Sequence, residues 1–81
     1  MFYLSNVSDA NDLSQLGKKH LRDGNYEDAL SFFEQALLLD PVNADLLNFK
    51  GIALRSLGRY DEASESYNES LEIEPRDKEA S

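Results

Sequence analysis

Two stretches of the sequence decide the fold, because GNYEDAL at residues 24–30 returns in similar form as GRYDEAS at residues 58–64. The same spacing of 34 residues holds without a gap on both sides of these stretches. The matched pairs are Gly17 and Gly51, Gly24 and Gly58, Tyr26 and Tyr60, Ala29 and Ala63, Phe33 and Tyr67, Leu37 and Leu71, and Pro41 and Pro75. A fixed period of this size predicts an array of repeated supersecondary units.

Each copy is predicted to hold two helices, because apolar residues recur at helical spacing within it. Gly24 and Gly58 stand where the first helix of each copy ends, at a position that favours a positive φ. Asn25 and Asn43 are each expected to cap the helix that follows. Pro41 ends a second helix, since proline disfavours helical conformation in the residue before it. The expected helices span residues 9–22, 26–39, 43–56 and 60–73.

Small residues explain why the unit is copied. Gly17 and Ala36, like Gly51 in the second copy, lack bulk on faces where two helices must approach closely, and an aromatic ring at Phe33 or Tyr67 fills the space beside them. A single helix pair cannot bury both of its faces. Stacking a second, similar pair buries more apolar surface.

Composition restricts the classes of partner. The chain has 81 residues, no cysteine, and a net charge of -8 from eight basic and sixteen acidic side chains. A charge of this sign repels nucleic acid and anionic membrane, so neither is expected as a partner. No stretch has the length of an apolar membrane span or the form of a signal peptide, and we expect a soluble, cytoplasmic protein.

The repeated residues resemble the tetratricopeptide repeat family over residues 10–77. The resemblance is carried by Leu13, Leu16, Gly17, Gly24, Tyr26, Ala29, Phe33, Ala36 and Pro41 and by their partners in the second copy. It implies an all-α fold of two stacked antiparallel helix-turn-helix repeats, a fragment of a right-handed α-solenoid. The expected divisions are a lead segment at 1–9, repeats at 10–43 and 44–77, and a tail at 78–81.

The resemblance also implies a function. Members of the family are scaffolds that bind peptides or other domains along a concave groove lined by the first helix of each repeat, and they are not enzymes as such. We therefore expect an adaptor for a peptide or protein partner, without cofactor, metal or catalysis. Carried over position by position, the groove would consist of Asn11, Ser14, Lys18, Leu21, Arg22, Asp45, Asn48, Ile52, Arg55 and Ser56.

Charge divides unevenly between the helices. The first helices of the two copies carry five basic and three acidic residues, whereas the second helices carry ten acidic residues and no basic one. The groove is thus the least acidic surface, with Lys18, Arg22 and Arg55 expected to point into it. An acidic or C-terminal carboxylate peptide is the predicted ligand. The alternative is that these three are ordinary solvated charges.

One specific version of this ligand is excluded by the sequence. Family members that clamp the carboxylate tails of chaperones use Lys and Asn in the first repeat, Asn in the second and basic residues in a third. The matching positions here hold Ser14, Lys18 and Phe49, and a third copy is absent from the sequence. That clamp is therefore not expected.

Catalytic and metal sites are disfavoured. His20 is the only histidine, and its place on the packed face of a helix favours a structural role. Asp61, Glu62, Glu65 and Glu69 could hold a divalent cation weakly. A solvated acidic face explains Asp61 and Glu62 without any metal, since both favour the N-terminus of their helix, and we prefer this interpretation. No phosphate-binding loop or nucleophile motif is found.

The ends of the stack leave alternatives open, because stacked repeats usually need about three units and polar caps. The last helix has Ser64, Ser66, Ser70 and Glu72 where the earlier one has Leu30, Phe32, Ala36 and Leu38. We interpret this as a polar outer cap, either of a short protein or of a fragment of a longer array. The competing hypothesis is a self-assembly module that forms a homodimer through Phe2, Tyr3, Leu4, Leu71 and Ile73.

Overall fold

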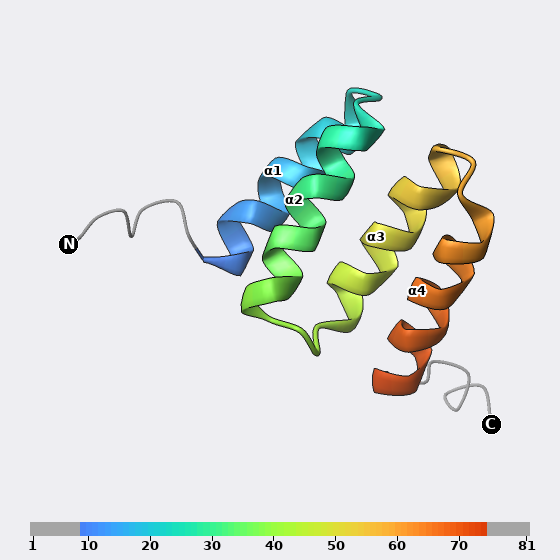
Figure 1. Cartoon of the computed structure of the whole chain (residues 1–81). Helices are drawn as coiled ribbons and strands as arrows, with labels where there is room; N and C mark the ends of the chain where they lie inside the picture. The colour runs from blue at the N-terminus through green and yellow to red at the C-terminus, as the bar shows by residue number, and fades with distance from the viewer. Residues whose placement is uncertain (1–8, 75–81) are drawn as a thin grey trace.

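The computed structural model describes residues 9–74, which form four α-helices in two antiparallel pairs (Figure 1). The helices are α1 (Ala10–Arg22), α2 (Tyr26–Leu39), α3 (Ala44–Ser56) and α4 (Tyr60–Ile73). Their bounds agree with the expected spans to within one residue. The all-α class of the repeat is confirmed.

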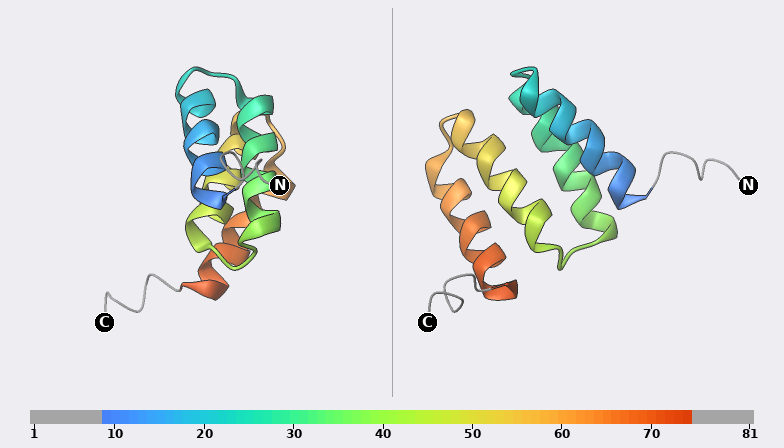
Figure 2. Two further views of the ribbon diagram at one scale, coloured as in Figure 1. Left: turned by 90° about the vertical axis from the view of Figure 1, so that its left-hand side faces the viewer. Right: turned by 180° about the vertical axis from the view of Figure 1, so that it is seen from behind.

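The four helices form two layers. α1 packs on α2 and α3 packs on α4, while α2 also packs on α3 and joins the two pairs. α1 and α3 therefore lie on one face and α2 and α4 on the other (Figure 2). Phe33 of α2 and Leu54 of α3 are the largest fully buried side chains among the described residues. The core thus lies where three helices meet, around α2 and α3.

A left-handed glycine ends the first helix of each pair. Gly24 and Gly58 both have φ of 83°. The amide of Gly24 donates to the carbonyl of Leu21 at 3.2 Å, and the amide of Asn25 donates to that of His20 at 2.8 Å. The same two bonds recur after α3. This Schellman arrangement satisfies carbonyls that the helix end leaves without partners, as the two glycines predicted.

A second pair of glycines allows the helices of each pair to touch. A Cβ atom on Gly17 would lie 2.7 Å from a ring carbon of Phe33, and one on Gly51 would lie 2.7 Å from a ring carbon of Tyr67. These distances are shorter than van der Waals contact, so only glycine fits with the rings in their present places. The predicted close approach is confirmed in both copies.

One of the two expected asparagine caps differs from the structure. Asn43 caps α3 as predicted, since its Oδ1 accepts from the amide of Leu46 at 3.1 Å. Asn25 precedes α2 but makes no side-chain cap, because its Nδ2 lies 3.4 Å from Nδ1 of His20 instead. His20 in turn stacks on Phe32, with ring centroids 5.3 Å apart. This histidine has a packing role in the structure.

The predicted polar cap on the outside of α4 is wrong for half of its residues. Ser66 and Ser70 are buried, and only Ser64 and Glu72 are exposed. The hydroxyl of Ser70 donates to the carbonyl of Ala44 at 3.0 Å. Ser66 and Ser70 lie four residues apart and share one side of α4, whereas Ser64 and Glu72 lie on the other side.

Residues 1–8 and 75–81 lie outside the described part of the chain. The predictions that concern the lead segment, the tail, Pro75 and Phe2, Tyr3 and Leu4 fall there. Among the helices that the structure describes, none has the length and apolar character needed to cross a membrane.

Candidate functional site

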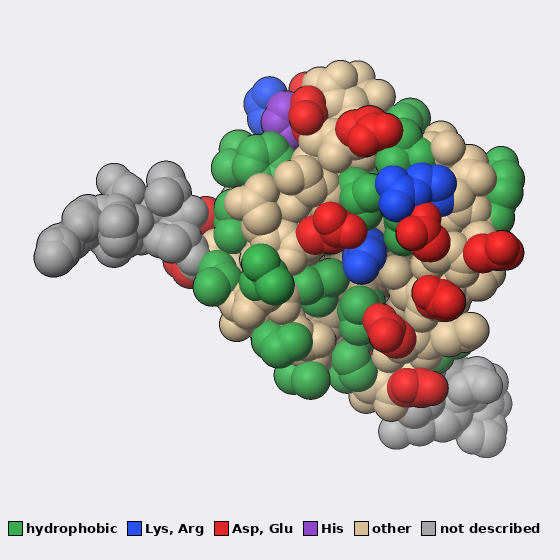
Figure 3. Space-filling view, viewed as in Figure 1, with side chains coloured by type: hydrophobic (Ala, Val, Ile, Leu, Met, Phe, Trp, Pro, Cys, Tyr) green, Lys and Arg blue, Asp and Glu red, His purple; other side chains and the backbone are tan. Residues whose placement is uncertain are grey.

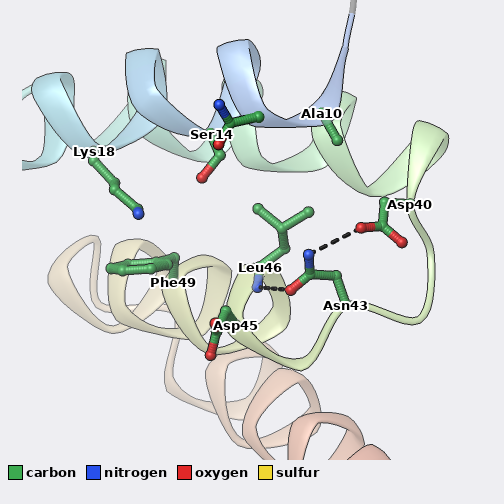
Figure 4. A pocket seen from close by; sticks show the side chains of 9 residues that line it. Ala10, Ser14, Lys18, Asp40, Asn43, Asp45, Leu46 and Phe49 are labelled. Atoms are coloured by element: carbon green, nitrogen blue, oxygen red, sulfur yellow. Dashed lines mark hydrogen bonds between the residues drawn. The ribbon is translucent and has the colours of Figure 1, made fainter.

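A cleft lies between α1 and α3, on the face of the first helices. These two helices contact each other only lightly, and the space between them has a volume of about 230 Å³. Figure 4 shows Ala10, Ser14 and Lys18 of α1 on one wall and Asp45, Leu46 and Phe49 of α3 on the other. Asp40 and Asn43 close the end of the cleft at the α2–α3 turn.

Hydrogen bonds fix the closed end of the cleft. Nδ2 of Asn43 donates to Oδ2 of Asp40 at 2.9 Å, while Oδ1 of the same side chain caps α3. Asn43 is thus held from both sides, and its amide orients the carboxylate of Asp40 at the edge of the cleft. The turn that links the two pairs is therefore also a structural part of the cleft.

Lys18 places a positive charge against an aromatic wall. Its Nζ lies 4.9 Å from the centroid of the Phe49 ring, a distance at which the cation and the ring attract each other. Phe49 also stacks on the buried Phe33, with centroids 5.4 Å apart. The core therefore holds the ring in place, and the ring positions the ammonium group at the cleft.

The structure brings together four of the ten predicted groove residues in this cleft, namely Asn11, Ser14, Lys18 and Asp45. The other six lie elsewhere. Leu21 packs against the core, Ile52 is half-buried, and Asn48 lines a separate hollow beside α4. Arg22, Arg55 and Ser56 are exposed near the C-terminal ends of α1 and α3 and do not line the cleft.

Basic residues fall into two groups within residues 9–74. Lys19, Lys50 and Arg59 each have a carboxylate within 4.0 Å, in Asp23, Glu34 and Glu62 respectively. Lys18, Arg22 and Arg55 have no such partner in this part of the chain. The three unpaired basic residues are those that the sequence placed in the groove.

The opposite face is acidic. Figure 3 views the side of α2 and α4, where carboxylates are scattered around a few Lys and Arg side chains. Arg59 donates from Nε to Oε1 of Glu62 at 2.6 Å and from Nη2 to Oε2 at 3.2 Å. These hydrogen bonds lower the pKa of Glu62 and raise the pKa of Arg59. Both side chains are exposed, so this pair contributes little to stability.

Sequence reasoning missed five residues that line the cleft, namely Ala10, Asp40, Asn43, Leu46 and Phe49. Phe49 has Gln15 at the equivalent position of the first copy, so the repeat pattern gives no sign of it. Phe49 follows Leu46 by three residues, and this helical spacing was the available sign that the two side chains share a face of α3. Among the described residues, no group of three or more His, Asp or Glu side chains is placed to hold a metal ion.

Comparisons with known proteins place the chain in one family. The profile described as tetratricopeptide repeat matches residues 14–78. The chain is similar to the Hsp70-Hsp90 organising protein of Plasmodium falciparum, with 38% identity over 68 residues that cover 84% of this chain and 27% of that protein. It is 30% identical over 69 residues to a TPR repeat-containing thioredoxin of Arabidopsis thaliana, covering 85% of this chain and 10% of that protein. An uncharacterised protein of Methanocaldococcus jannaschii is 43% identical over 51 residues, 63% of this chain and 59% of that protein.

Proposed function

The chain belongs to the tetratricopeptide repeat family, and we propose that it binds an acidic peptide segment of a partner protein in the cleft between α1 and α3. It acts as an interaction module without a cofactor or a reaction of its own. The similar protein of Plasmodium falciparum is named as an organiser of Hsp70 and Hsp90, which supports an adaptor function. The chain covers about a quarter of that protein, so the identity of the partner is part of the proposal.

The observation that carries the proposal is the state of Lys18. Its ammonium group stands at the cleft, over the Phe49 ring, with no carboxylate partner among residues 9–74. A carboxylate of the ligand would complete an ion pair there, while the aromatic ring offers an apolar contact beside it. Arg22 and Arg55, which also have no carboxylate partner within residues 9–74, extend the positive charge beyond the cleft.

The ligand should differ from a chaperone tail. The clamp of the chaperone-binding members relies on a Lys and an Asn where this chain has Ser14 and Lys18, and on a second Asn where it has Phe49. An acidic side chain with a neighbouring apolar residue suits Lys18 and Phe49 better than a bare carboxylate tail. The cytoplasmic location expected from the sequence is part of this same proposal.

The test is a titration with a labelled peptide that contains Asp, Glu and Leu, compared with its counterpart that contains Asn, Gln and Leu. The acidic peptide should bind saturably, and Lys18→Ala should weaken it by about tenfold, the size of one charge-assisted hydrogen bond. The double variant Arg22→Ala with Arg55→Ala should weaken it less. Lys19→Ala is the matched control, because Lys19 is already paired with Asp23 at 3.6 Å. Equal affinity of all four proteins for both peptides would refute the proposal.

Self-assembly is the second candidate function. Leu71 and Ile73 are 47% and 38% exposed on α4, which leaves apolar surface for a second chain. Sedimentation over a wide range of protein concentration separates the two functions. A monomer of 9.2 kDa supports the interaction module, and a stable dimer supports assembly.

A further inference from the structure

The cleft between α1 and α3 is lined by charges of both signs. Lys18 is basic, whereas Asp40 and Asp45 are acidic, so the lining carries more negative than positive charge. Within residues 9–74, none of these three side chains has an oppositely charged group within 4.0 Å. A ligand that carries only carboxylates would pair with Lys18 and leave the two aspartates without a counterion.

The two signs lie at different places along the cleft. Lys18 faces Phe49, with Nζ 4.9 Å from the ring centroid. Asp45 precedes Phe49 by about one turn of α3, which is about 6 Å along the helix. Asp40 lies opposite Ala10 at the closed end of the cleft (Figure 4), and Ala10 is two turns, or about 12 Å, from Lys18. The carboxylates are therefore offset from Lys18 toward the closed end.

Ser14 offers a hydrogen-bonding group between the two ends. The residue is only 9% exposed, and its side chain points from α1 into the cleft (Figure 4). Within residues 9–74, its hydroxyl has no hydrogen-bond partner. A polar group at this depth normally has one. The hydroxyl therefore points to a polar group of a ligand, such as a peptide unit, in the middle of the cleft.

An extended peptide fits these spacings. It advances about 3.3 Å per residue, so side chains two to four residues apart cover the offset between Lys18 and the two aspartates. We propose that the partner segment carries charges of both signs. An acidic residue pairs with Lys18, and a Lys or Arg two to four residues away lies beside Asp45 and Asp40. This inference rests on the proposed function, to which it adds a second charge and its spacing.

The position of Asp45 in its helix provides a matched control. Asp12, Asp45 and Asp61 each stand in the first turn of a helix, where the helix dipole favours a carboxylate. Asp45 lines the cleft, whereas Asp12 and Asp61 do not. Asp40 lies beyond the end of α2, and its Oδ2 accepts from Nδ2 of Asn43 at 2.9 Å. An asparagine at position 40 would retain an oxygen for this hydrogen bond.

The experiment is an NMR titration with three nine-residue peptides that are blocked at both ends. Each has Glu at its centre and Leu on both sides of the Glu, and its two end residues are both Lys, both Gln or both Glu. The peptides are symmetric, so the result does not depend on the direction in which a peptide binds. The Lys peptide should bind at least about threefold more tightly than the Gln peptide, and the Glu peptide should bind more weakly than the Gln peptide.

Protein variants locate this preference. The protein has a net charge of -8 and attracts any cationic peptide, so two double variants with the same change in charge are compared. Asp40→Asn with Asp45→Asn should abolish the preference for the Lys peptide and strengthen binding of the Glu peptide. Asp12→Asn with Asp61→Asn should leave the order of the three affinities unchanged. Circular dichroism of both variants confirms that the helices are retained.

Two variants of α1 connect this test with the proposed function. Lys18→Ala should weaken all three peptides, because each contains the central Glu. Ser14→Ala should also weaken all three, and by a similar factor for each, because the hydroxyl contacts the peptide backbone that they share.

The possible failures of the inference and of the proposed function differ. Equal affinity of the Lys and Gln peptides would overturn the inference, as would an equal preference for the Lys peptide in the two double variants. In either case the proposed function stands when the Gln peptide still binds and still depends on Lys18. A failure of all three peptides to bind would overturn both.

Discussion

The two helix pairs make the same close contact with different side chains. In the first pair Gly17 faces Phe33, which is fully buried and stacked on Phe49 of the next pair. In the second pair Gly51 faces Tyr67, which is half-buried and borders the hollow beside α4. The ring of Phe33 is thus covered on both sides and that of Tyr67 on one.

This difference shows how position in the stack changes the contribution of a repeated residue to stability. The glycine and the ring fix how two helices approach within a pair, and this contact is nearly identical in both copies. The neighbour on the other side of the ring determines how much of the ring is buried, and therefore how much the ring contributes to the free energy of unfolding. Equivalent residues of the two pairs should therefore contribute differently to stability. Substitutions in the first pair should destabilise the protein more than the same substitutions in the second.

The largest expected effect is the loss of the Phe33 ring. Phe33→Ala should cost about 3–5 kcal/mol of unfolding free energy, because it opens a cavity between three helices. Small domains have little more than this in total, so we expect a largely unfolded protein. Tyr67→Ala should cost less and leave a folded protein. Urea unfolding followed by circular dichroism measures both, and an equal loss would contradict the comparison.

The two interior glycines provide a finer test. Gly17→Ala forces a methyl group against a ring that cannot move, at an overpacking cost of about 1–3 kcal/mol. The better helix propensity of alanine offsets only about 1 kcal/mol of this cost. Gly51→Ala meets a ring that can shift toward the hollow, so its net effect should be close to zero. Thermal unfolding of both variants gives the difference in stability.

The two glycines in the turns are controls for the Gly17→Ala and Gly51→Ala variants. Gly24 and Gly58 share the same φ of 83°, and a Cβ atom at either would meet nothing within 4 Å. Gly24→Ala and Gly58→Ala should each cost about 1 kcal/mol through backbone strain alone. Unequal costs at these two positions would show that the pairs differ in backbone as well as in packing.

A smaller effect is expected from the buried hydroxyl of α4. Ser70 donates to the carbonyl of Ala44 at 3.0 Å, whereas the first pair has Ala36 at the equivalent position. Ser70→Ala should cost about 1 kcal/mol, the net value of one hydrogen bond. The exposed Ser64→Ala is the matched control and should be neutral. Chemical denaturation of the two variants distinguishes a structural serine from a surface one.

The smallest effect concerns the pair of Arg59 and Glu62, for which the first copy has Asn25 and Asp28. The hydrogen bond from Arg59 lowers the pKa of Glu62 in the folded protein. Its contribution to stability is therefore present above the pKa of the unfolded carboxyl and is lost as the pH falls through the lowered, folded pKa. Arg59→Ala should raise the pKa of Glu62 toward its ordinary value. A carboxyl titration followed by NMR measures this shift, and an unchanged pKa would show that the ion pair does not persist in solution.

Much of the fold could be predicted because its determinants are local or periodic. The glycines at 24 and 58 and the proline at 41 bound the helices, and the spacing of 34 residues fixes the pairing. The absence of a side-chain cap at Asn25 could not be predicted, because it depends on His20, whose Nδ1 lies 3.4 Å from Nδ2 of Asn25 across the turn. Ser66 and Ser70 of α4 were misplaced, because a comparison of copies shows which residues changed but not which way each one faces.

The candidate site was predicted less completely than the fold. Lys18 and Ser14 were found because they lie at repeat positions on α1. Phe49 was missed because it replaces a polar residue of the first copy and acts as core and cleft wall at once. Arg22 and Arg55 were placed in the groove by register, but their helices end beyond the cleft that the side chains enclose.

The measurement that tests the account most directly is an NMR titration of the labelled protein with the acidic peptide. The account predicts that amide shifts concentrate on α1 and α3 around Ser14, Lys18 and Phe49 and saturate together. The amides of α4 should not move. Shifts confined to α2 and α4, or no saturable shifts at all, would contradict the assignment of the cleft as the peptide-binding site.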